Sequence, residues 1–509
     1  MSGISLNFDN THFVHTRGME EMTEEALRAS VDLYAGTQVR EIIFCVNAQR
    51  ASFDSAVWES WLSGFDAKAG PEQPLLAPLD AKAREALHSR LMKAAALREK
   101  GIDLFACLLA RAREKGLSAW LSMRMNDMHF SNRLDHPSHS TLWRTRPDLW
   151  RAGGRPVATG LDRAFDYAQP EVFDHHFALV REIAERFDFD GLELDWSRHF
   201  HFLRPGHELT DAPVLTRFVR QTRELLRDKE RRAGRALRLG VRVPETPRTA
   251  CGLGMDAVRW AREGLVDMIV PTPQWYSTDF NMPVAEWKEW LDGTGVLLGA
   301  GFERAVQPHL HWPHGGIREQ PASAEVVRGA AATFLQQGAD RVYLFNYFDR
   351  ETSQLGGALY SAGDPGILAE IGDLDTLAGK PRRHLVTHQD VLAPGEPPNS
   401  VLPLTIEAPA PGGARLAQVR LMTGPRPTQG RATIFLGFKD AAPPQDIAVY
   451  VNGRQGQPLG EQPVPPPAPA APPHAWALPL DAFHDGYNLL EILSGSPCAI
   501  VWVEARFDP

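Results

Sequence analysis

The segment DGLELDWSRHFHF, residues 190–202, carries two carboxylates one residue apart inside an apolar run. A buried carboxylate costs free energy unless it is paired, hydrogen-bonded or used in a reaction. Two further acids close apolar runs of the same kind, Glu245 at the end of 237–245 and Glu303 at the end of 295–303. Hydrolysis of a glycosidic bond needs two carboxyl groups, one that protonates the leaving oxygen and one that attacks or activates water. Asp195, Glu245 and Glu303 are therefore candidate catalytic residues.

The pairing of these acids depends on which strands carry them. Asp195 and Glu245 are expected on adjacent strands, about 4.8 Å apart, close to the roughly 5 Å between the carboxyls of a retaining pair. Asp195 should then be ionised beside arginines, whereas Glu245 should lie in drier surroundings and keep its proton. Glu303 is expected three strands from Asp195 and offers a wider, inverting pair instead.

These acids need a scaffold that brings the ends of strands together. Eight apolar runs of strand type alternate with helical patterns, and they cover residues 4–10, 40–47, 117–126, 190–196, 237–245, 266–274, 295–303 and 341–348. Strands that alternate with helices predict a parallel sheet, and eight such units predict a closed (β/α)8 barrel of the α/β class. A doubly wound sheet fits less well, because no GxGxxG follows the first strand. We expect the barrel to span residues 1–365.

Polar residues fall where such a barrel would hold a ligand, at the carboxyl ends of its strands. Alternation along each strand points one parity inward, which would place Asn346 inside on the eighth strand and Glu193 between Arg124 and Arg242 as an ion pair that shapes the site. Trp275 and Tyr276 follow the sixth strand and would offer flat faces to sugar rings. The residues predicted to bind substrate are Asn7, Asp9, Asn47, Arg124, Asn126, His129, Glu193, Arg198, His199, Gln274, Trp275, Tyr276 and Asn346.

Histidines gather after the third, fourth and seventh strands, and such residues can ligate metals. The first strand, however, has Asn7-Phe8-Asp9 in place of the HxH of metal-dependent barrel hydrolases. We therefore expect no metal and no other cofactor. Hydroxyl recognition is the expected use of the histidines, or binding of an acidic group together with Arg124, Arg198 and Arg304.

The composition of the chain changes near residue 366, where proline and glycine become more frequent and alternating strand patterns replace helical ones. We expect a linker over 366–390 and an antiparallel β-sandwich over 391–509. The expected strands lie in 401–408, 432–439, 447–454, 489–493 and 499–507. The proline-rich run 463–473 should be a solvated, mobile loop within this domain.

Composition limits the partners. The net charge of −9 argues against nucleic acid or an anionic membrane as the partner. The carboxylates at the strand ends indicate a carbohydrate substrate. The four cysteines contain no CxxC pair and suit reduced thiols. The first residues show no signal peptide and no apolar run is long enough to span a bilayer, so we expect a cytoplasmic protein, or an exported one whose signal lies outside this sequence. Nothing in the sequence predicts the oligomeric state.

The motif DGLELDWSR resembles the fourth-strand pattern DG-x-x-x-D-x-x-R of glycoside-hydrolase-like barrels of the family-10-like group. MRMNDMHF (123–130) and RTRPDLWR (144–151) are similar to other proteins of that group. The resemblance covers about residues 1–365 and implies the barrel fold and action on a carbohydrate. VYVNGR and DGYNLLEIL resemble the galactose-binding-like sandwiches that are appended to glycosidases.

Two departures limit what this resemblance implies. Chitinase-type barrels have DG-x-D-x-D-x-E, and Ser197 stands here in place of the proton-donating glutamate. Other barrel glycosidases end the fourth strand with Asn-Glu, where this chain has Leu194-Asp195. The leading hypothesis is a retaining glycoside hydrolase. The alternatives are a catalytically silent carbohydrate-binding barrel and a metal-dependent barrel hydrolase that uses the histidines.

Overall fold

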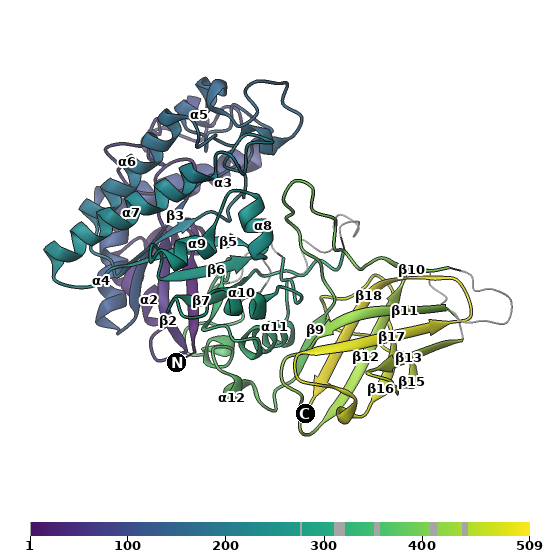
Figure 1. The fold of residues 1–509 in the computed structure, drawn as a ribbon. Coiled ribbons are helices and arrows are strands. Elements are labelled where there is room, and N and C mark those ends of the chain that lie inside the picture. Colours follow the sequence, from purple (N-terminus) through teal and green to yellow (C-terminus); the bar gives the residue numbers. More distant parts are fainter. Residues whose placement is uncertain (1, 275–276, 310–320, 351–356, 408–414, 440–445) are drawn as a thin grey trace.

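The computed structural model describes residues 2–274, 277–309, 321–350, 357–407, 415–439 and 446–509. Its first part is a closed barrel of parallel strands, in which each strand pairs with the next and β8 pairs with β1 (Figure 1). The strands are β1 (Ile4–Phe8), β2 (Val39–Cys45), β3 (Ser118–Arg124), β4 (Gly191–Asp195), β5 (Arg238–Pro244), β6 (Met268–Thr272), β7 (Leu297–Phe302) and β8 (Arg341–Leu344). Seven of them lie within the predicted apolar runs and β2 begins one residue before its run, so the (β/α)8 barrel is confirmed.

Helices connect the strands and cover the outside of the barrel (Figure 1). Seven of the described helices begin after a Thr, Asp or Ser whose side chain accepts a hydrogen bond from the backbone N–H three residues later. The helices are α1 (His12–Thr16), α2 (Glu24–Asp32), α3 (Ala81–Glu99), α4 (Leu104–Glu114), α5 (Thr141–Thr145), α6 (Pro170–Arg186), α7 (Ala212–Ala233), α8 (Pro247–Gly252), α9 (Ala257–Arg262), α10 (Val284–Trp290), α11 (Ala324–Gln336) and α12 (Leu374–Leu377). Among the described residues, no helix has the length and apolar character needed to cross a membrane.

The barrel interior has an apolar cluster of its own, separate from the core between strands and helices. Its buried members are Ile43, Trp120, Met268, Val270, Tyr343 and Phe345. The Trp120 indole fits because Gly191 faces it: a Cβ added at Gly191 would lie 2.2 Å from the ring. A glycine at the start of β4 therefore makes room for the tryptophan that fills the barrel.

The inward parity of β8 differs from the prediction. Tyr343 donates a hydrogen bond to Glu193 and Phe345 lies among arginines, so the odd residues face the interior. Asn346 belongs to the other parity and reaches the mouth for a different reason, because its backbone is left-handed (φ 60°) just beyond the strand. The expectation that Asn346 follows the alternation was wrong, although its side chain does lie at the mouth.

The second part of the chain is an antiparallel β-sandwich, as predicted. One sheet has the order β10–β18–β12–β16–β15, with β9 also paired to β18, and the other has β11–β17–β13–β14. The strands are β9 (Arg382–Leu385), β10 (Leu404–Ile406), β11 (Arg415–Met422), β12 (Arg431–Phe438), β13 (Ile447–Val451), β14 (Arg454–Gln455), β15 (Gln457–Glu461), β16 (His474–Leu478), β17 (Tyr487–Ser494) and β18 (Cys498–Asp508). Apolar side chains of both sheets form one buried core, among them Val419, Ile434, Val449, Ile492 and Val503.

The sandwich docks on the barrel through α11 and β9, which lie side by side (Figure 1). Gly329 of α11 permits the approach, since a Cβ there would lie 1.9 Å from the carbonyl oxygen of Arg383. Thr333 of the same helix lies 3.2 Å from the Nδ1 of His384. β9 falls inside the range expected as a linker and pairs with β18 of the sandwich.

The proline-rich run 463–473 is not wholly solvated, contrary to the prediction. Arg383, a fully buried residue, donates hydrogen bonds to the carbonyls of Pro465 (2.9 Å) and Pro467 (2.7 Å). The same guanidinium pairs with Glu504 on β18 at 2.6 and 2.8 Å. Proline carbonyls are strong acceptors, so a buried arginine can anchor a segment that has few backbone N–H donors of its own.

Beyond β9 the chain turns back along the mouth of the barrel. Thr387 donates to Asp279 (2.7 Å), Gln389 donates to Thr249 (2.6 Å), and the N–H of Gln274 donates to Asp390 (2.9 Å). Thr249, Gln274 and Asp279 all follow the ends of β5 and β6. Residues 386–399, here called the rim segment, thus complete one side of the mouth.

Candidate active site

Asp195 ends β4 and is held by donors from two sides. Arg242, its cross-strand neighbour on β5, donates from Nη1 to Oδ2 at 3.0 Å, and the N–H of Ser197 donates to Oδ1 at 3.0 Å. Both side chains of the ion pair are 1% exposed. Asp195 is therefore a buried carboxylate whose charge is balanced by one guanidinium.

Glu193 is surrounded by neutral donors and not by the two arginines that the sequence suggested. Its Oε1 accepts hydrogen bonds from Ser122 (2.7 Å) and Tyr343 (2.9 Å), and Asn7 lies at 3.5 Å. Burial, followed by the negative charge of Asp195, raises the pKa of Glu193 to about 7. The predicted ion pair was wrong because Arg242 is directed at Asp195, one layer nearer the mouth.

Phe345 lies at the centre of this mouth and contacts three cations. Its ring centroid is 4.1 Å from the guanidinium carbon of Arg242, 5.2 Å from that of Arg198 and 6.0 Å from that of Arg124. Attraction between a guanidinium and the face of a ring is strengthened where water is excluded. One buried phenylalanine thus helps to hold three arginines around the carboxylates.

A second polar network follows β1 and β3. Arg124 pairs with Asp9 and lies 3.4 Å from Asp127, which accepts a 2.7 Å hydrogen bond from the Nδ1 of His129. Burial alone would raise the pKa of Asp127, but the His129 imidazole and the Arg124 guanidinium hold it well below its usual range. Arg198 donates to the Nε2 of His129 at 3.1 Å.

Glu303 follows β7 and faces the same mouth. Its Oε2 accepts a hydrogen bond from Asn346 (2.9 Å), and its Oε1 lies 3.8 Å from the Nη1 of Arg198. Burial alone would lower the pKa of Arg242, but nearby acids, first Asp195 and to a smaller extent Glu303, raise it. Asp195 and Glu303 therefore lie around the same set of arginines.

Two residues of this site have strained backbones. Asn346 has φ 60° and His199 has φ 148°, both in the region that favours glycine. The His199 Nδ1 accepts a hydrogen bond from the N–H of Met128 (3.1 Å), which ties the loop after β4 to the loop after β3. Strained non-glycine residues gather at functional sites, so both observations favour a site at this mouth.

Glu245 lies in a different environment from Asp195. It is buried beside Asp279 and Asp390, and burial, followed by the charges of these two acids, raises its pKa well above the usual range. This direction agrees with the expectation that Glu245 lies in dry surroundings and keeps its proton. The groups that act on its pKa are those of the rim segment and of the loop after β6, and Asp195 is not among them.

A cavity of about 400 Å³ opens at the mouth above β1, β2 and β3. We call it the mouth cavity. Arg124, Arg198 and Asn346 line its inner end, and Arg90 and Leu91 of α3 line another part of its wall. Phe130, at its rim, is 47% exposed and stacks on His136 with ring centroids 3.8 Å apart. The cavity therefore combines charged groups with an exposed aromatic face.

The remaining predicted residues have structural contacts or lie outside the described residues. Asn47 bonds the backbone of Arg124 through both its amide atoms, and Asn126 donates to the carbonyls of Phe165 and His201. Gln274 contributes its N–H to Asp390. Trp275 and Tyr276 are not among the described residues.

Several residues of the site were not predicted. Tyr343 and Phe345 could have been predicted from the sequence, because they alternate along β8 with the same parity as Arg341 and that parity faces the barrel interior. Asp279 and Asp390 could not have been predicted, because they are far from Glu245 in sequence and lie beside it only in the folded chain. Within the described part of the chain, no group of three or more His, Cys, Asp or Glu is arranged to hold a metal ion.

Comparisons with known proteins give only remote likeness. No family model matches the chain, and no curated protein matches it. Among solved structures, α-L-fucosidase isoenzyme 2 from Paenibacillus thiaminolyticus is 14% identical over 68% of this chain and 46% of its own, with a TM-score of 0.41. This chain thus covers less than half of that protein.

Two further solved structures are similar at the same level. The glycoside hydrolase domain of PgaB (BpsB) from Bordetella bronchiseptica is 9% identical over 68% of this chain and 94% of its own, with a TM-score of 0.37. The catalytic domain of GH30 xylanase C from Talaromyces cellulolyticus is 10% identical over 97% of each chain, with a TM-score of 0.35. At such identities, the chemistry of this chain has to follow from its own side chains.

Proposed function

We propose that this protein is a glycoside hydrolase whose reacting carboxyl groups are Asp195 and Glu303. The observation that carries the proposal is the placement of both carboxylates at the barrel mouth around Arg198 and Arg242, beside the mouth cavity. Asp195 has the fixed, charge-balanced position that an attacking carboxylate needs. Glu303 has one oxygen on the Asn346 amide and the other near Arg198, and is the second carboxyl that the reaction requires.

Glu303 is preferred to Glu245 as the partner of Asp195 for a geometric reason. Asp195 pairs with Arg242, Glu303 lies 3.8 Å from Arg198, and the ring of Phe345 contacts both of these arginines. Glu245 faces Asp279 and Asp390 instead. We assign Glu245 to the support of the rim, where a protonated acid lets the rim segment pack against the loop after β6.

In the proposed reaction, Asp195 attacks the anomeric carbon while Glu303, which has to be protonated in the substrate complex, gives its proton to the leaving oxygen. Glu303 then removes a proton from the water that releases the sugar from Asp195, so the configuration is retained. Arg124, Asp9 and His129 would contact hydroxyl groups of the saccharide, and Phe130 would stack on a ring.

The test is hydrolysis of a panel of aryl glycosides by the wild-type protein and by Asp195→Asn and Glu303→Gln. Both variants should lose turnover on any glycoside that the wild type cleaves, and proton NMR of the first product should show the starting anomeric configuration. Inversion would assign activation of water to Asp195. Full activity of Asp195→Asn would exclude the proposed mechanism.

A catalytically silent carbohydrate-binding protein is the second candidate. It is favoured by the burial of the two carboxylates, each 1% exposed and neither among the described residues that line the mouth cavity. Saccharide binding without turnover on the panel, unchanged in Asp195→Asn, would support it. A metal-dependent hydrolase, the third candidate, would lose its activity to a chelator.

A further inference from the structure

The mouth cavity holds more positive than negative charge, although the whole chain carries a net charge of −9. Its described lining includes two carboxylates, Asp9 and Asp127, and the four arginines Arg50, Arg90, Arg124 and Arg198. A concentration of guanidinium groups against the overall charge of the molecule points to an anion as the ligand.

Both carboxylates of the cavity already have their donors. Asp9 accepts from the N–H (2.8 Å) and the hydroxyl (2.6 Å) of Thr11 and pairs with Arg124. Asp127 accepts from the N–H and the Nδ1 of His129, and Arg124 lies 3.4 Å away. Neither acid forms a hydrogen bond or an ion pair with Arg90.

Three of the arginines also have partners. Arg50 donates to the carbonyls of His139 and Ser63, each at 3.0 Å. Arg124 pairs with Asp9, and Arg198 lies near Glu303 and bonds to His129.

Arg90 differs from these three. Within the described parts of the chain, its guanidinium forms no hydrogen bond or ion pair, and it lines the cavity from α3 together with Leu87 and Leu91. Burial lowers the pKa of Arg90, and the charge of Asp9 opposes that shift. An arginine stays protonated in a protein, so this partly buried cation lacks the partner that would offset its lost hydration.

We propose that Arg90 binds an anionic substituent, a carboxylate or a sulfate ester, of a saccharide held in the mouth cavity. The planar guanidinium can bind either group through two parallel N–H bonds. Leu75, Leu87 and Leu91 line the same cavity and have no side-chain acceptor to offer it. This inference rests on the proposed function for the saccharide and extends it to an acidic substrate class.

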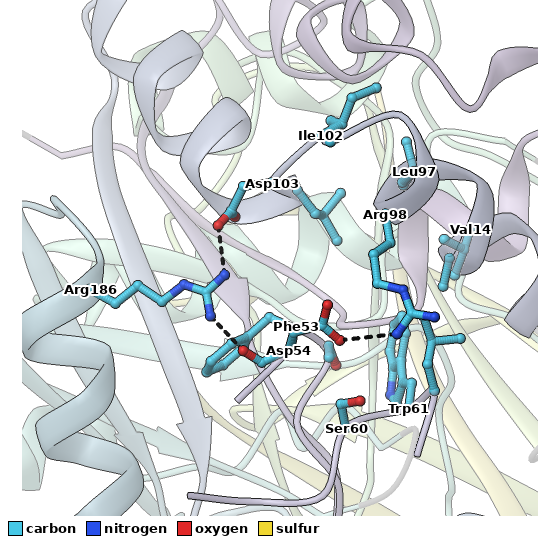
Figure 2. Close-up of a pocket in the computed structure, with 15 residues that line it drawn as sticks. Val14, Phe53, Asp54, Ser60, Trp61, Leu97, Arg98, Ile102, Asp103 and Arg186 are labelled. Atoms are coloured by element: carbon cyan, nitrogen blue, oxygen red, sulfur yellow. Dashed lines mark hydrogen bonds and ion pairs between the residues drawn. The ribbon is translucent and has the colours of Figure 1, made fainter. Parts of the chain in front are cut away.

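The neighbouring cavity provides a matched control. It has a volume of about 230 Å³ and shares Val14 and Trp61 with the mouth cavity. Figure 2 shows Arg98, also on α3, directed into this second cavity and paired with Asp54 at 3.6 Å. Arg98→Ala therefore removes the same charge from the same helix without changing the wall of the mouth cavity.

The experiment measures binding and not turnover. Methyl glycosides of glucose, glucuronic acid and glucose 6-sulfate, and the galactose equivalents, would be titrated into the full chain at low salt by calorimetry. We expect at least one acidic member to bind about tenfold or more tightly than its neutral counterpart, the effect of a charge-assisted hydrogen bond. Whether the acid or the sulfate is preferred identifies the substituent, and the preference should weaken as salt is added.

In Arg90→Met, which keeps the apolar stem, that preference should fall about tenfold, whereas Arg98→Ala should keep it. Thermal unfolding of both variants would check that they fold. Equal binding of acidic and neutral members, no binding of any member, or an unchanged preference in Arg90→Met would overturn the inference. If acidic saccharides bind in an Arg90-dependent way but no aryl glycoside is cleaved, the role of Arg90 is upheld and the hydrolase function is rejected. If aryl glycosides are cleaved but acidic saccharides are not preferred, the hydrolase function is upheld and the role of Arg90 is rejected.

Discussion

The Asp195–Arg242 pair brings opposite charges within 3.0 Å at a place where each side chain is 1% exposed. Desolvation of two charges is costly, and their mutual attraction offsets it only while both are present. The two members of the pair therefore depend on each other for stability.

Removal of Asp195 alone should therefore destabilise the protein. Asp195→Ala leaves Arg242 buried without a counter-charge, and we expect a loss of about 3 kcal/mol in the free energy of unfolding. The double variant Asp195→Ala/Arg242→Met should recover most of that loss, because no charge remains buried. Urea unfolding of the four proteins of this cycle measures the effect, and a double variant no more stable than Asp195→Ala would contradict it.

Glu193 should make stability depend on pH. Its pKa is raised to about 7 in the folded protein, so the folded state holds a proton that the unfolded state releases near pH 4.5. The stability that this proton contributes is complete below about pH 4.5, is lost as pH rises through about 7, and amounts to about 3 kcal/mol at most. Glu193→Gln cannot ionise, and its amide oxygen can still accept from Ser122 and Tyr343.

The measurement is the unfolding free energy of wild type and Glu193→Gln at pH 5 and pH 8. The variant should lose less stability than the wild type between these two values. Glu85→Gln, on the exposed side of α3, controls for the change in net charge. Parallel pH profiles for wild type and Glu193→Gln would show that Glu193 does not hold the proton.

At the scale of elements, the strands were predictable and many of their side-chain contacts were not. Short apolar runs between helical patterns identified all eight barrel strands, and Asp195 lies at the end of β4 as expected. Which guanidinium meets which carboxylate depends on the register between strands, which pairs Asp195 with Arg242 on one side and Arg124 on the other. No pattern within one strand contains that register.

Two other elements show why local patterns fail. β11 alternates well, with Ala417, Val419 and Leu421 buried and the polar residues between them exposed, and its signal was overlooked. The position of Asn346 depends on a left-handed backbone beyond β8, which overrides the alternation that was assumed for it. Glu245 meets Asp390 across 145 positions of sequence, so its pKa could not be argued from neighbours along the chain.

The contact between α11 and β9 can be tested with one methyl group. Alanine normally stabilises a helix relative to glycine by up to about 1 kcal/mol. At Gly329 the added Cβ would lie 1.9 Å from a backbone oxygen, which no side-chain rotation can relieve. Gly329→Ala should therefore lower the melting temperature by about 5 °C. Ser89→Ala, on the exposed side of α3, measures how much an alanine stabilises a helix where no such contact exists. A higher melting temperature in both variants would show that the contact between α11 and β9 tolerates a methyl group.

At the scale of the whole molecule, barrel and sandwich should unfold together. Trp502 and Leu385 of the sandwich strands belong to the same buried cluster as the barrel core, and the rim segment hydrogen-bonds the loops after β5 and β6. Scanning calorimetry of the full chain should show one transition. A chain ended at residue 380 should melt at a lower temperature, since α11 loses its cover and Asp279 loses Thr387. Two separate transitions, with the shorter chain melting at the temperature of the first, would mean that the parts are independent.

The rim segment also bears on how such a gene could be inherited. Recombination that exchanges whole domains would join a foreign partner near residue 380 and remove the residues that face Asp279, Gln274 and Thr249 at the mouth. In the recombined protein, the barrel would lack the rim segment, so Glu245 would be exposed and one wall of the mouth would be missing. Descendants of this chain should for that reason transmit both parts as a single unit, and any that discard the sandwich should have replaced the acids around position 245.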